Sequence, residues 1–153
     1  MFSSKLIKRI FKDISALGAL PFYLFLSFFV LLLGEIKLFV WLMAGLFLSY
    51  FITAIIRIIY HKDRPKKIDY KNFLEKIDAS SFPSLHSWKI IMLSTLTGFY
   101  YRSVYLTVLL LFLSFLVLFS RYYLKKHYII DIIFGGLFGL IEAIGIILFL
   151  PKI

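Results

Sequence analysis

The sequence predicts an all-α integral membrane protein, a bundle of five transmembrane helices that follows an N-terminal interfacial amphipathic helix. Of its 153 residues, 61% are hydrophobic and 20% aromatic, which is far above the values of soluble domains. The apolar residues form long runs without strand-like alternation, so helices that cross a bilayer core of about 30 Å are favoured over a barrel. The length fits one membrane-embedded domain over residues 1–153.

The first 17 residues are basic and amphipathic. Apolar side chains recur every three or four positions from residue 2 to residue 17, with lysine, arginine and aspartate on the remaining arc. This pattern predicts an interfacial helix over residues 1–17. A cleaved signal peptide is the alternative, but no small-residue cleavage site follows, and we expect the segment to be retained. If this helix also enters the membrane, the bundle has six membrane helices.

Five apolar runs are the candidate spans. The first is short for a crossing and starts with Pro21, which the first turn of a helix tolerates. A long polar stretch, residues 60–83, separates the second run from the third, and we expect it to form a lid or headgroup-binding loop. The five runs are residues 20–33, 38–59, 84–100, 104–120 and 127–150.

The charge is concentrated in few places. A net charge of +10 on so apolar a chain crowds the basic residues into the polar stretches, where they face phosphate-bearing ligands or lipid headgroups. The sequence has no cysteine, which excludes thiolate metal sites and a cysteine nucleophile. We expect no metal and no cofactor. The expected partners are a membrane lipid and the bilayer rather than nucleic acid, and the oligomeric state is left open.

The stretch from Ser120 to Asp131 places an arginine, a histidine and an aspartate where two apolar runs meet. If the last helix begins at His127, then His127 and Asp131 lie four residues apart on one face. Asp131 would then accept a hydrogen bond from one ring nitrogen of His127 and leave the other nitrogen free to attack. A basic cluster beside the membrane with a surface His-Asp pair is the alternative.

Counting spans places three polar clusters on the same side of the membrane. Together they supply guanidinium, imidazole, hydroxyl and carboxylate groups, an inventory that suits in-line phosphoryl transfer. Arginine suits this task because its fork binds two phosphate oxygens at once. The clusters are Arg57 with Arg64-Pro65, then Pro83-Ser84-Leu85-His86, then Ser120-Arg121 with His127 and Asp131.

These motifs resemble those of the type 2 phosphatidic acid phosphatase superfamily, the membrane-bound lipid phosphate phosphatases. The first family motif is a basic residue, six others and Arg-Pro, and it is met by Arg57 and Arg64-Pro65. The second, Pro-Ser-Gly-His, reads Pro83-Ser84-Leu85-His86. The third, Ser-Arg, five residues, His, three residues, Asp, is matched in full over residues 120–131. The resemblance therefore covers residues 57–131.

The resemblance implies a metal-independent phosphatase in which His127 becomes phosphorylated, Asp131 orients it and His86 protonates the leaving oxygen. It also implies a phosphate site made by Arg57, Arg64, Ser84, Leu85 and Arg121.

The sequence departs from the family pattern at two of these positions. Arg57 stands where the family usually has lysine, which keeps the charge but changes its shape. Leu85 replaces a glycine, but its amide can still donate to phosphate at an ordinary helix N-terminus.

The resemblance and the dense lysines favour an envelope lipid, and among these lipid A 1-phosphate, as substrate. Undecaprenyl diphosphate and phosphatidylglycerol phosphate are the alternatives. Relatives that oxidise halides at the same site are soluble proteins, which argues against that activity in this apolar chain. A catalytically silent lipid-binding or transport protein of the same fold is disfavoured, because both motif histidines and the aspartate are present. Five lysines are candidate headgroup contacts: Lys62, Lys66, Lys67, Lys125 and Lys126.

Two features of the last run have alternative readings. Gly135 and Gly139 form a small-x-x-x-small pair, which fits either a dimer face or close packing within the bundle. Glu142 lies inside the predicted span and is either functional or a hydrogen-bonded packing residue, the reading that we favour.

The side of the membrane that the site faces is ambiguous. Of the 18 lysines and arginines, only Lys37, Arg102 and Lys152 fall on the side opposite the site, so 15 fall on the side of the site. The positive-inside rule would place that side in the cytoplasm. Because a phosphate site needs many of those charges, we instead expect an inner-membrane protein whose site faces the periplasm.

Overall fold

The computed structural model describes residues 4–150, which form seven α-helices and no strand. The starting residues of the predicted N-terminal helix and the predicted position of Lys152 lie outside this range. The helices are α1 (Ser4–Ala16), α2 (Leu20–Leu32), α3 (Ile36–Ile59), α4 (Phe73–Ala79), α5 (Leu85–Tyr101), α6 (Val104–Tyr123) and α7 (Ile129–Phe149).

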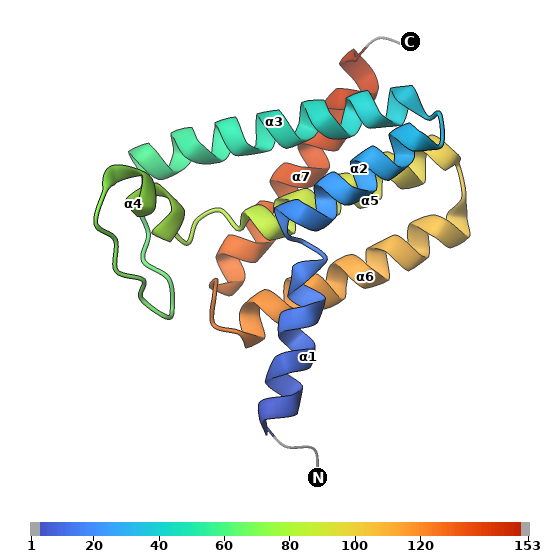
Figure 1. Ribbon diagram of the computed structural model, residues 1–153. Coiled ribbons are helices and arrows are strands. Elements are labelled where there is room, and N and C mark those ends of the chain that lie inside the picture. The colour runs from blue at the N-terminus through green and yellow to red at the C-terminus, as the bar shows by residue number, and fades with distance from the viewer. Residues whose placement is uncertain (1–3, 151–153) are drawn as a thin grey trace.

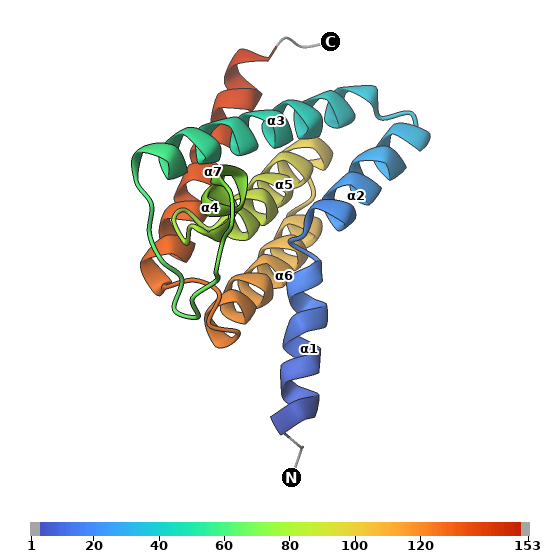
Figure 2. The same cartoon turned by 60° about the vertical axis from the view of Figure 1, so that its left-hand side comes forward.

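Helix α5 lies at the centre of the bundle and packs against α3, α6 and α7, while α2 packs on α3 (Figures 1 and 2). Its side chains Met92, Leu93 and Leu96 are buried in the same core as Trp41 and Leu42 of α3. This arrangement brings the first turn of α5 next to the C-terminal ends of α3 and α6, where the polar loops also gather.

Glycines on α7 allow its close approach to α5. A β-carbon on Gly135 would overlap the Ser84 carbonyl, and one on Gly139 would overlap the Trp88 carbonyl. The two glycines are one helical turn apart and therefore face α5 together. Close packing within the bundle accounts for them, so a dimer face is not needed. Glu142, one turn further along α7, accepts a hydrogen bond from the Trp88 indole, as expected for a hydrogen-bonded packing residue.

The number of long apolar helices is smaller than the five predicted spans. Helices α3, α6 and α7 are long and apolar enough to cross a membrane, and α1 with α2 would make a fourth span, bent by 44° at the break between them. Pro21 near the start of α2 marks this break, because it cannot donate the backbone hydrogen bond that would continue α1. Helix α5 has only 17 residues and is surrounded by other helices.

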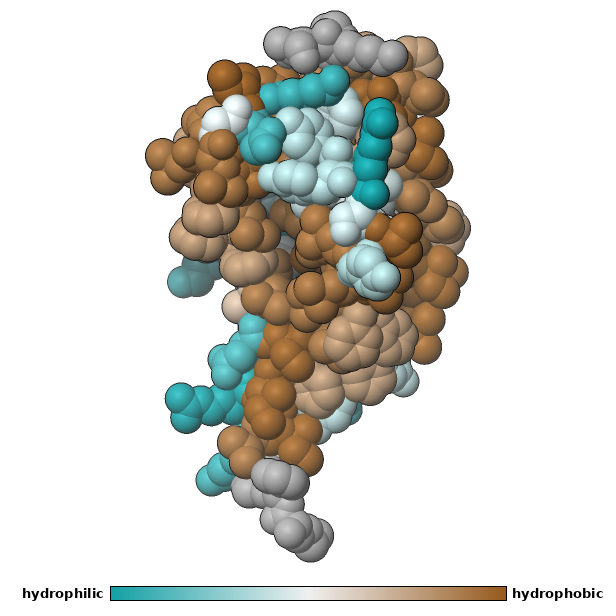
Figure 3. All heavy atoms as spheres, turned by 90° about the vertical axis from the view of Figure 1, so that its right-hand side faces the viewer, coloured by the Kyte–Doolittle hydropathy of each residue, from teal (hydrophilic) through white to brown (hydrophobic). Residues whose placement is uncertain are grey.

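The N-terminal helix forms as predicted and packs against the C-terminal half of α6, which carries Arg121 in its last turn. The Phe11 ring contacts the rings of Phe119 and Tyr123, at centroid distances of 5.6 and 4.3 Å. Figure 3 shows hydrophilic and hydrophobic atoms on opposite sides of α1, at the bottom of the view, below a broad hydrophobic surface. Its position at the membrane surface stays a prediction.

The polar loop between α3 and α5 contains a short helix that the sequence analysis did not predict. Helix α4 begins after Asn72, whose side chain accepts a hydrogen bond from the Glu75 amide at 2.8 Å. The loop is held to the bundle by the Lys66 amide, which donates to the Lys125 carbonyl at 3.3 Å. It therefore covers the end of the bundle where the sequence motifs meet.

Candidate active site

A cavity of about 270 Å³ lies at this end of the bundle. Six of the residues predicted for the site line it, although they are spread over 71 positions from residue 57 to residue 127. Its lining residues are Leu20, Tyr50, Arg57, Arg64, Asp78, Leu85, His86, Lys89, Arg121 and His127. The predicted convergence of the three motifs is therefore seen in the structure.

The three motif arginines enter the cavity from the last turn of α3, the polar loop and the last turn of α6. Arg57 is buried and donates to the carbonyls of Ile77 and Pro83, at 3.2 and 3.1 Å. Arg64 donates to the carbonyl of Asp78 at 2.6 Å. The Nε–H groups of Arg57, Arg64 and Arg121 are buried and have no hydrogen-bond partner within residues 4–150. These donors are available to an anion, and a buried donor left unpaired is costly.

Arg121 is held by the N-terminal helix, which the sequence analysis did not connect with the site. One of its terminal nitrogens donates to the Ser15 hydroxyl at 2.7 Å, and both side chains are buried. The other lies 3.5 Å from Nε2 of His127. Next to Ser15, a β-carbon on Gly18 would come within 3.3 Å of the His86 ring, so this stretch forms a wall of the site.

His127 is only 2% exposed, and the geometry defines its tautomer. Its Nδ1 lies 2.7 Å from the Ser81 carbonyl, which can only accept, so Nδ1 carries the hydrogen and the unprotonated Nε2 presents its lone pair on the side of Arg121. Burial, followed by the charges of Arg121 and Arg64, lowers the pKa of His127 to about 2. The ring is therefore neutral at physiological pH, as a nucleophile requires.

The predicted hydrogen bond between His127 and Asp131 is wrong. Helix α7 begins at Ile129 with Tyr128 as its N-cap, so His127 precedes the helix and the two side chains do not share a helical face. Asp131 is instead the third residue of α7, where its carboxylate accepts from the Tyr128 amide at 2.9 Å. The same carboxylate accepts from the Ser81 hydroxyl, and the Ser81 carbonyl holds His127. Asp131 thus contacts the histidine through Ser81.

Lys62 has a different place from the one predicted. Its ammonium lies 2.5 Å from Oδ1 of Asp131 and 4.7 Å from the centre of the Tyr128 ring, so it pairs with a carboxylate at the site. Among the other predicted headgroup contacts, Lys66 and Lys125 line a separate pocket described below, whereas Lys67 and Lys126 line no cavity described here.

The second motif forms the first turn of α5. Ser84 caps the helix: its Oγ accepts from the Ser87 amide and lies 2.9 Å from the Ser87 hydroxyl. Ser84 does not line the cavity, and its contact with phosphate stays a prediction. Leu85 and His86 are the first two residues of the helix, whose amides have no intrahelical acceptor and suit an anion. Within residues 4–150, positive φ angles occur at Gly34, Arg102 and Lys125, so Leu85 needs no glycine-like backbone.

Sequence reasoning missed Lys89, Tyr50 and Asp78. Lys89 is buried, and its Nζ lies 3.5 Å from the Tyr50 hydroxyl. A signal was present: Lys89 follows His86 by three residues and is the only lysine inside an apolar run, so it shares the His86 face of α5. No signal marked Tyr50 or Asp78, because their positions depend on how α3 and the polar loop pack.

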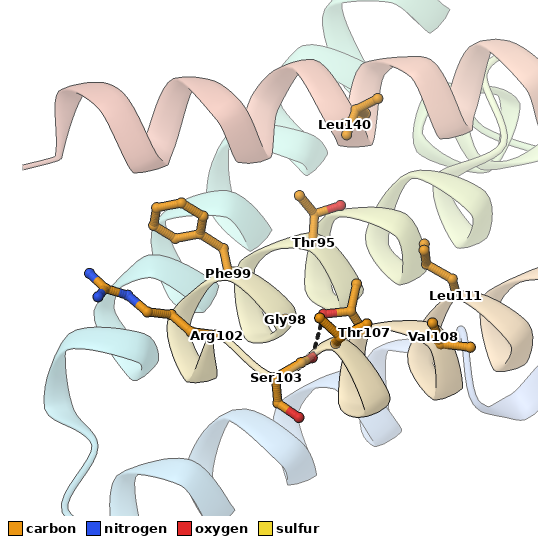
Figure 4. A pocket seen from close by; sticks show the side chains of 10 residues that line it. Thr95, Gly98, Phe99, Arg102, Ser103, Thr107, Val108, Leu111 and Leu140 are labelled. Atoms are coloured by element: carbon orange, nitrogen blue, oxygen red, sulfur yellow. Dashed lines mark hydrogen bonds between the residues drawn. The ribbon is translucent and has the colours of Figure 1, made fainter.

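The same end of the bundle offers no metal centre within residues 4–150, where no three histidine, aspartate or glutamate side chains come together to hold an ion. A further cavity of about 570 Å³ lies at the opposite end of α5, a distance of about 25 Å for a 17-residue helix. Figure 4 shows its mostly apolar lining, with the Thr107 hydroxyl bonded to the Ser103 carbonyl and Arg102 pointing outward. It contains no acid or imidazole and does not suit hydrolysis.

The fold and the site define a class of protein: an all-α membrane protein with a basic, imidazole-containing cavity at one end of its bundle. The chain belongs to the PAP2 superfamily, because the model of that family matches residues 38–153. This match confirms the resemblance drawn from the three motifs. Together with the basic cavity, it supports a membrane-bound phosphatase.

A solved structure shows the same fold. The crystal structure of Aquifex aeolicus LpxE superposes with a TM-score of 0.80 at 20% identity, covering 96% of this chain and 88% of that one. No curated protein matches the sequence significantly.

Proposed function

We propose that this protein is a lipid phosphatase that works through a phosphohistidine at His127. The observation that carries the proposal is the cavity itself: a neutral imidazole with an unprotonated Nε2 lies beside three guanidiniums whose buried Nε–H groups are unpaired within residues 4–150. Such a site neutralises the equatorial oxygens of a phosphoryl group and offers one nucleophile. An ordinary lipid-binding or transport protein would not need this nucleophile.

The reaction has two displacement steps. Nε2 of His127 attacks phosphorus, and the bond from phosphorus to the lipid oxygen breaks as the new P–N bond forms. His86 gives its proton to the departing lipid oxygen. Water then attacks the phosphohistidine, His86 takes the proton from that water, and the P–N bond breaks to release inorganic phosphate. Arg57, Arg64 and Arg121 hold the phosphoryl oxygens in both steps.

No step of this reaction calls for a metal ion, since the guanidiniums supply the positive charge. The acid role of His86 is favoured by the substrate itself, because a bound phosphate dianion stabilises an imidazolium. Asp131 acts on His127 through Ser81, and Lys62 pairs with the same carboxylate and holds it in place.

For the substrate we propose an envelope lipid that bears a phosphate or diphosphate, and lipid A 1-phosphate first. The dense lysines and arginines around the site support a multiply phosphorylated headgroup, and the fold shared with LpxE is in keeping with this choice. Undecaprenyl diphosphate and phosphatidylglycerol phosphate remain the alternatives. We place the protein in the inner membrane with its site on the periplasmic face.

Phosphate release from a panel of purified lipids tests this proposal. Lipid A, undecaprenyl diphosphate and phosphatidylglycerol phosphate are incubated with the purified protein and with the His127→Ala variant, which we expect to be inactive. Release from lipid A alone supports the first substrate, and release from another lipid replaces it. No release from any phosphorylated lipid by the folded protein contradicts the phosphatase function.

A further inference from the structure

A second basic pocket lies outside the catalytic cavity. It has a volume of about 600 Å³ and is lined by four lysines from three separate segments, with no acidic residue among its lining. The lysines are Lys5 and Lys8 of α1, Lys66 of the polar loop and Lys125 between α6 and α7. Ser4, Tyr123 and Leu124 complete the lining.

The packing of the chain keeps these lysines together. The Lys66 amide donates to the Lys125 carbonyl, which ties the loop to the link after α6. The contacts of Phe11 with Phe119 and Tyr123 fix α1 on α6 beside them. Lys125 has a φ of 53°, a left-handed backbone conformation that residues other than glycine seldom adopt.

Positive charges crowd together in this region. The pKa of neighbouring Lys126 is lowered by burial first, and then by the charges of Arg121, Arg64, Lys66 and Lys12. Like charges held this close repel one another, and an anion bound between them would relieve that repulsion.

A groove rich in tyrosine adjoins both the basic pocket and the catalytic cavity. This groove has a volume of about 640 Å³ and contains Tyr122, Tyr123 and Tyr128. It shares His127 with the catalytic cavity, and it shares Tyr123 and Lys125 with the basic pocket. Tyrosine rings offer broad, uncharged contact surfaces with a polar edge. The groove, bordered by Lys125, therefore lies beside two basic spaces, each suited to an anion, and its tyrosines suit an uncharged group.

We propose that the basic pocket binds a second anionic group while the phosphate to be removed lies in the catalytic cavity. This inference rests on the proposed function. The second anion is either another phosphate on the same headgroup, with the uncharged body of the headgroup over the tyrosines, or the headgroup of a neighbouring anionic lipid. Because Lys5 and Lys8 lie outside the matched region 38–153, a segment beyond the shared family region contributes this selectivity.

Two adjacent residues of α1 provide a matched test. Both side chains are exposed, but Lys8 lines the pocket and Arg9 does not. Lys8→Glu and Arg9→Glu make the same change of charge. The first arm measures kcat/KM in neutral detergent micelles for a synthetic disaccharide lipid with a phosphate at both ends and for one with a single phosphate.

We expect the wild-type protein to prefer the probe with two phosphates. Lys8→Glu should lower the ratio of the two kcat/KM values about tenfold, the effect of losing one charge-assisted contact, while Arg9→Glu should leave the ratio unchanged. A smaller loss of the same kind is expected for Lys8→Gln, which removes the charge without reversing it.

The second arm separates the two sources of the anion. The probe with one phosphate is presented in phosphatidylcholine vesicles with or without phosphatidylglycerol. If phosphatidylglycerol stimulates the wild-type protein and Lys8→Glu alone loses that stimulation, the anion comes from a neighbouring lipid. Equal losses for Lys8→Glu and Arg9→Glu, or no loss in either arm, would overturn the proposal, because diffuse attraction to the surface would then suffice.

Binding to the inert His127→Ala protein keeps this test separate from the proposed function. If no probe is hydrolysed by the wild-type protein, the phosphatase proposal fails, yet the pocket is still tested by the affinity of the inert protein for the two probes. Selective loss of affinity for the probe with two phosphates on adding Lys8→Glu supports the pocket, and equal affinities refute it.

Discussion

Replacing Ser81 by alanine tests how Asp131 acts on the nucleophile. The change removes the hydroxyl that donates to Asp131 and leaves the Ser81 carbonyl that accepts from His127. The lost hydrogen bond is buried and involves a charged acceptor, and such bonds contribute about 1.5–3 kcal/mol. If this whole contribution serves to orient His127, kcat falls by roughly 10- to 150-fold with a smaller change in KM.

The assay is a double-mutant cycle with phosphate release as the readout. His127→Ala should abolish turnover, and Asp131→Asn should leave a small residual rate because the aspartate only positions the histidine. If Asp131 acts through Ser81, adding Ser81→Ala to Asp131→Asn lowers kcat little further, since both changes break the same path.

Three outcomes would refute parts of this reasoning. A wild-type kcat in Ser81→Ala would show that Ser81 does not position His127. Losses that multiply in the double variant would show that Ser81 and Asp131 act independently. Equal, near-wild-type rates in His127→Ala and Asp131→Asn would end the phosphohistidine mechanism. Thermal unfolding of each variant controls for damage to the Lys62–Asp131 pair, in which the carboxylate is buried and the ammonium is partly exposed.

Four further predictions follow from the site. Ser15→Ala frees a guanidinium nitrogen of Arg121 and should raise KM about tenfold, whereas Ser15→Thr should retain activity; unchanged KM in the alanine variant would contradict a role for α1. Activity should survive strong chelators and be blocked by vanadate, and loss on chelation with recovery on adding a divalent ion would require a metal. Because the folded pKa of His127 is about 2, below its ordinary value of 6.5, only the unfolded chain takes up this proton as pH falls through 6.5. Between pH 7 and 5 the protein should thus lose about 2 kcal/mol of stability that His127→Gln does not lose, and equal losses would contradict the shift. Finally, a cysteine at Lys71 in this cysteine-free chain should react with an impermeant thiol reagent in intact cells, whereas one at Lys152 should not; the reverse pattern would place the site in the cytoplasm.

The sequence by itself determined the helices and the chemical groups of the site. Long apolar runs must form helices in a bilayer, because each backbone group then finds its partner within the run, and α3 and α6 accordingly lie close to their predicted ranges. The spacing of the arginines and histidines was specific enough to predict that Arg57, His86 and His127 meet in one place. These features depend on local pattern, which a single sequence contains.

Only the tertiary structure decided how those groups are held. Whether His127 lies inside α7 depends on where the helix begins, and a shift of two residues moved it off the Asp131 face and onto the Ser81 carbonyl. Ser15 reaches Arg121 across 106 positions of sequence because α1 packs on α6. Such contacts depend on which helix faces meet, and that is set by the fit of many side chains at once, as where Gly135 and Gly139 let α7 approach α5.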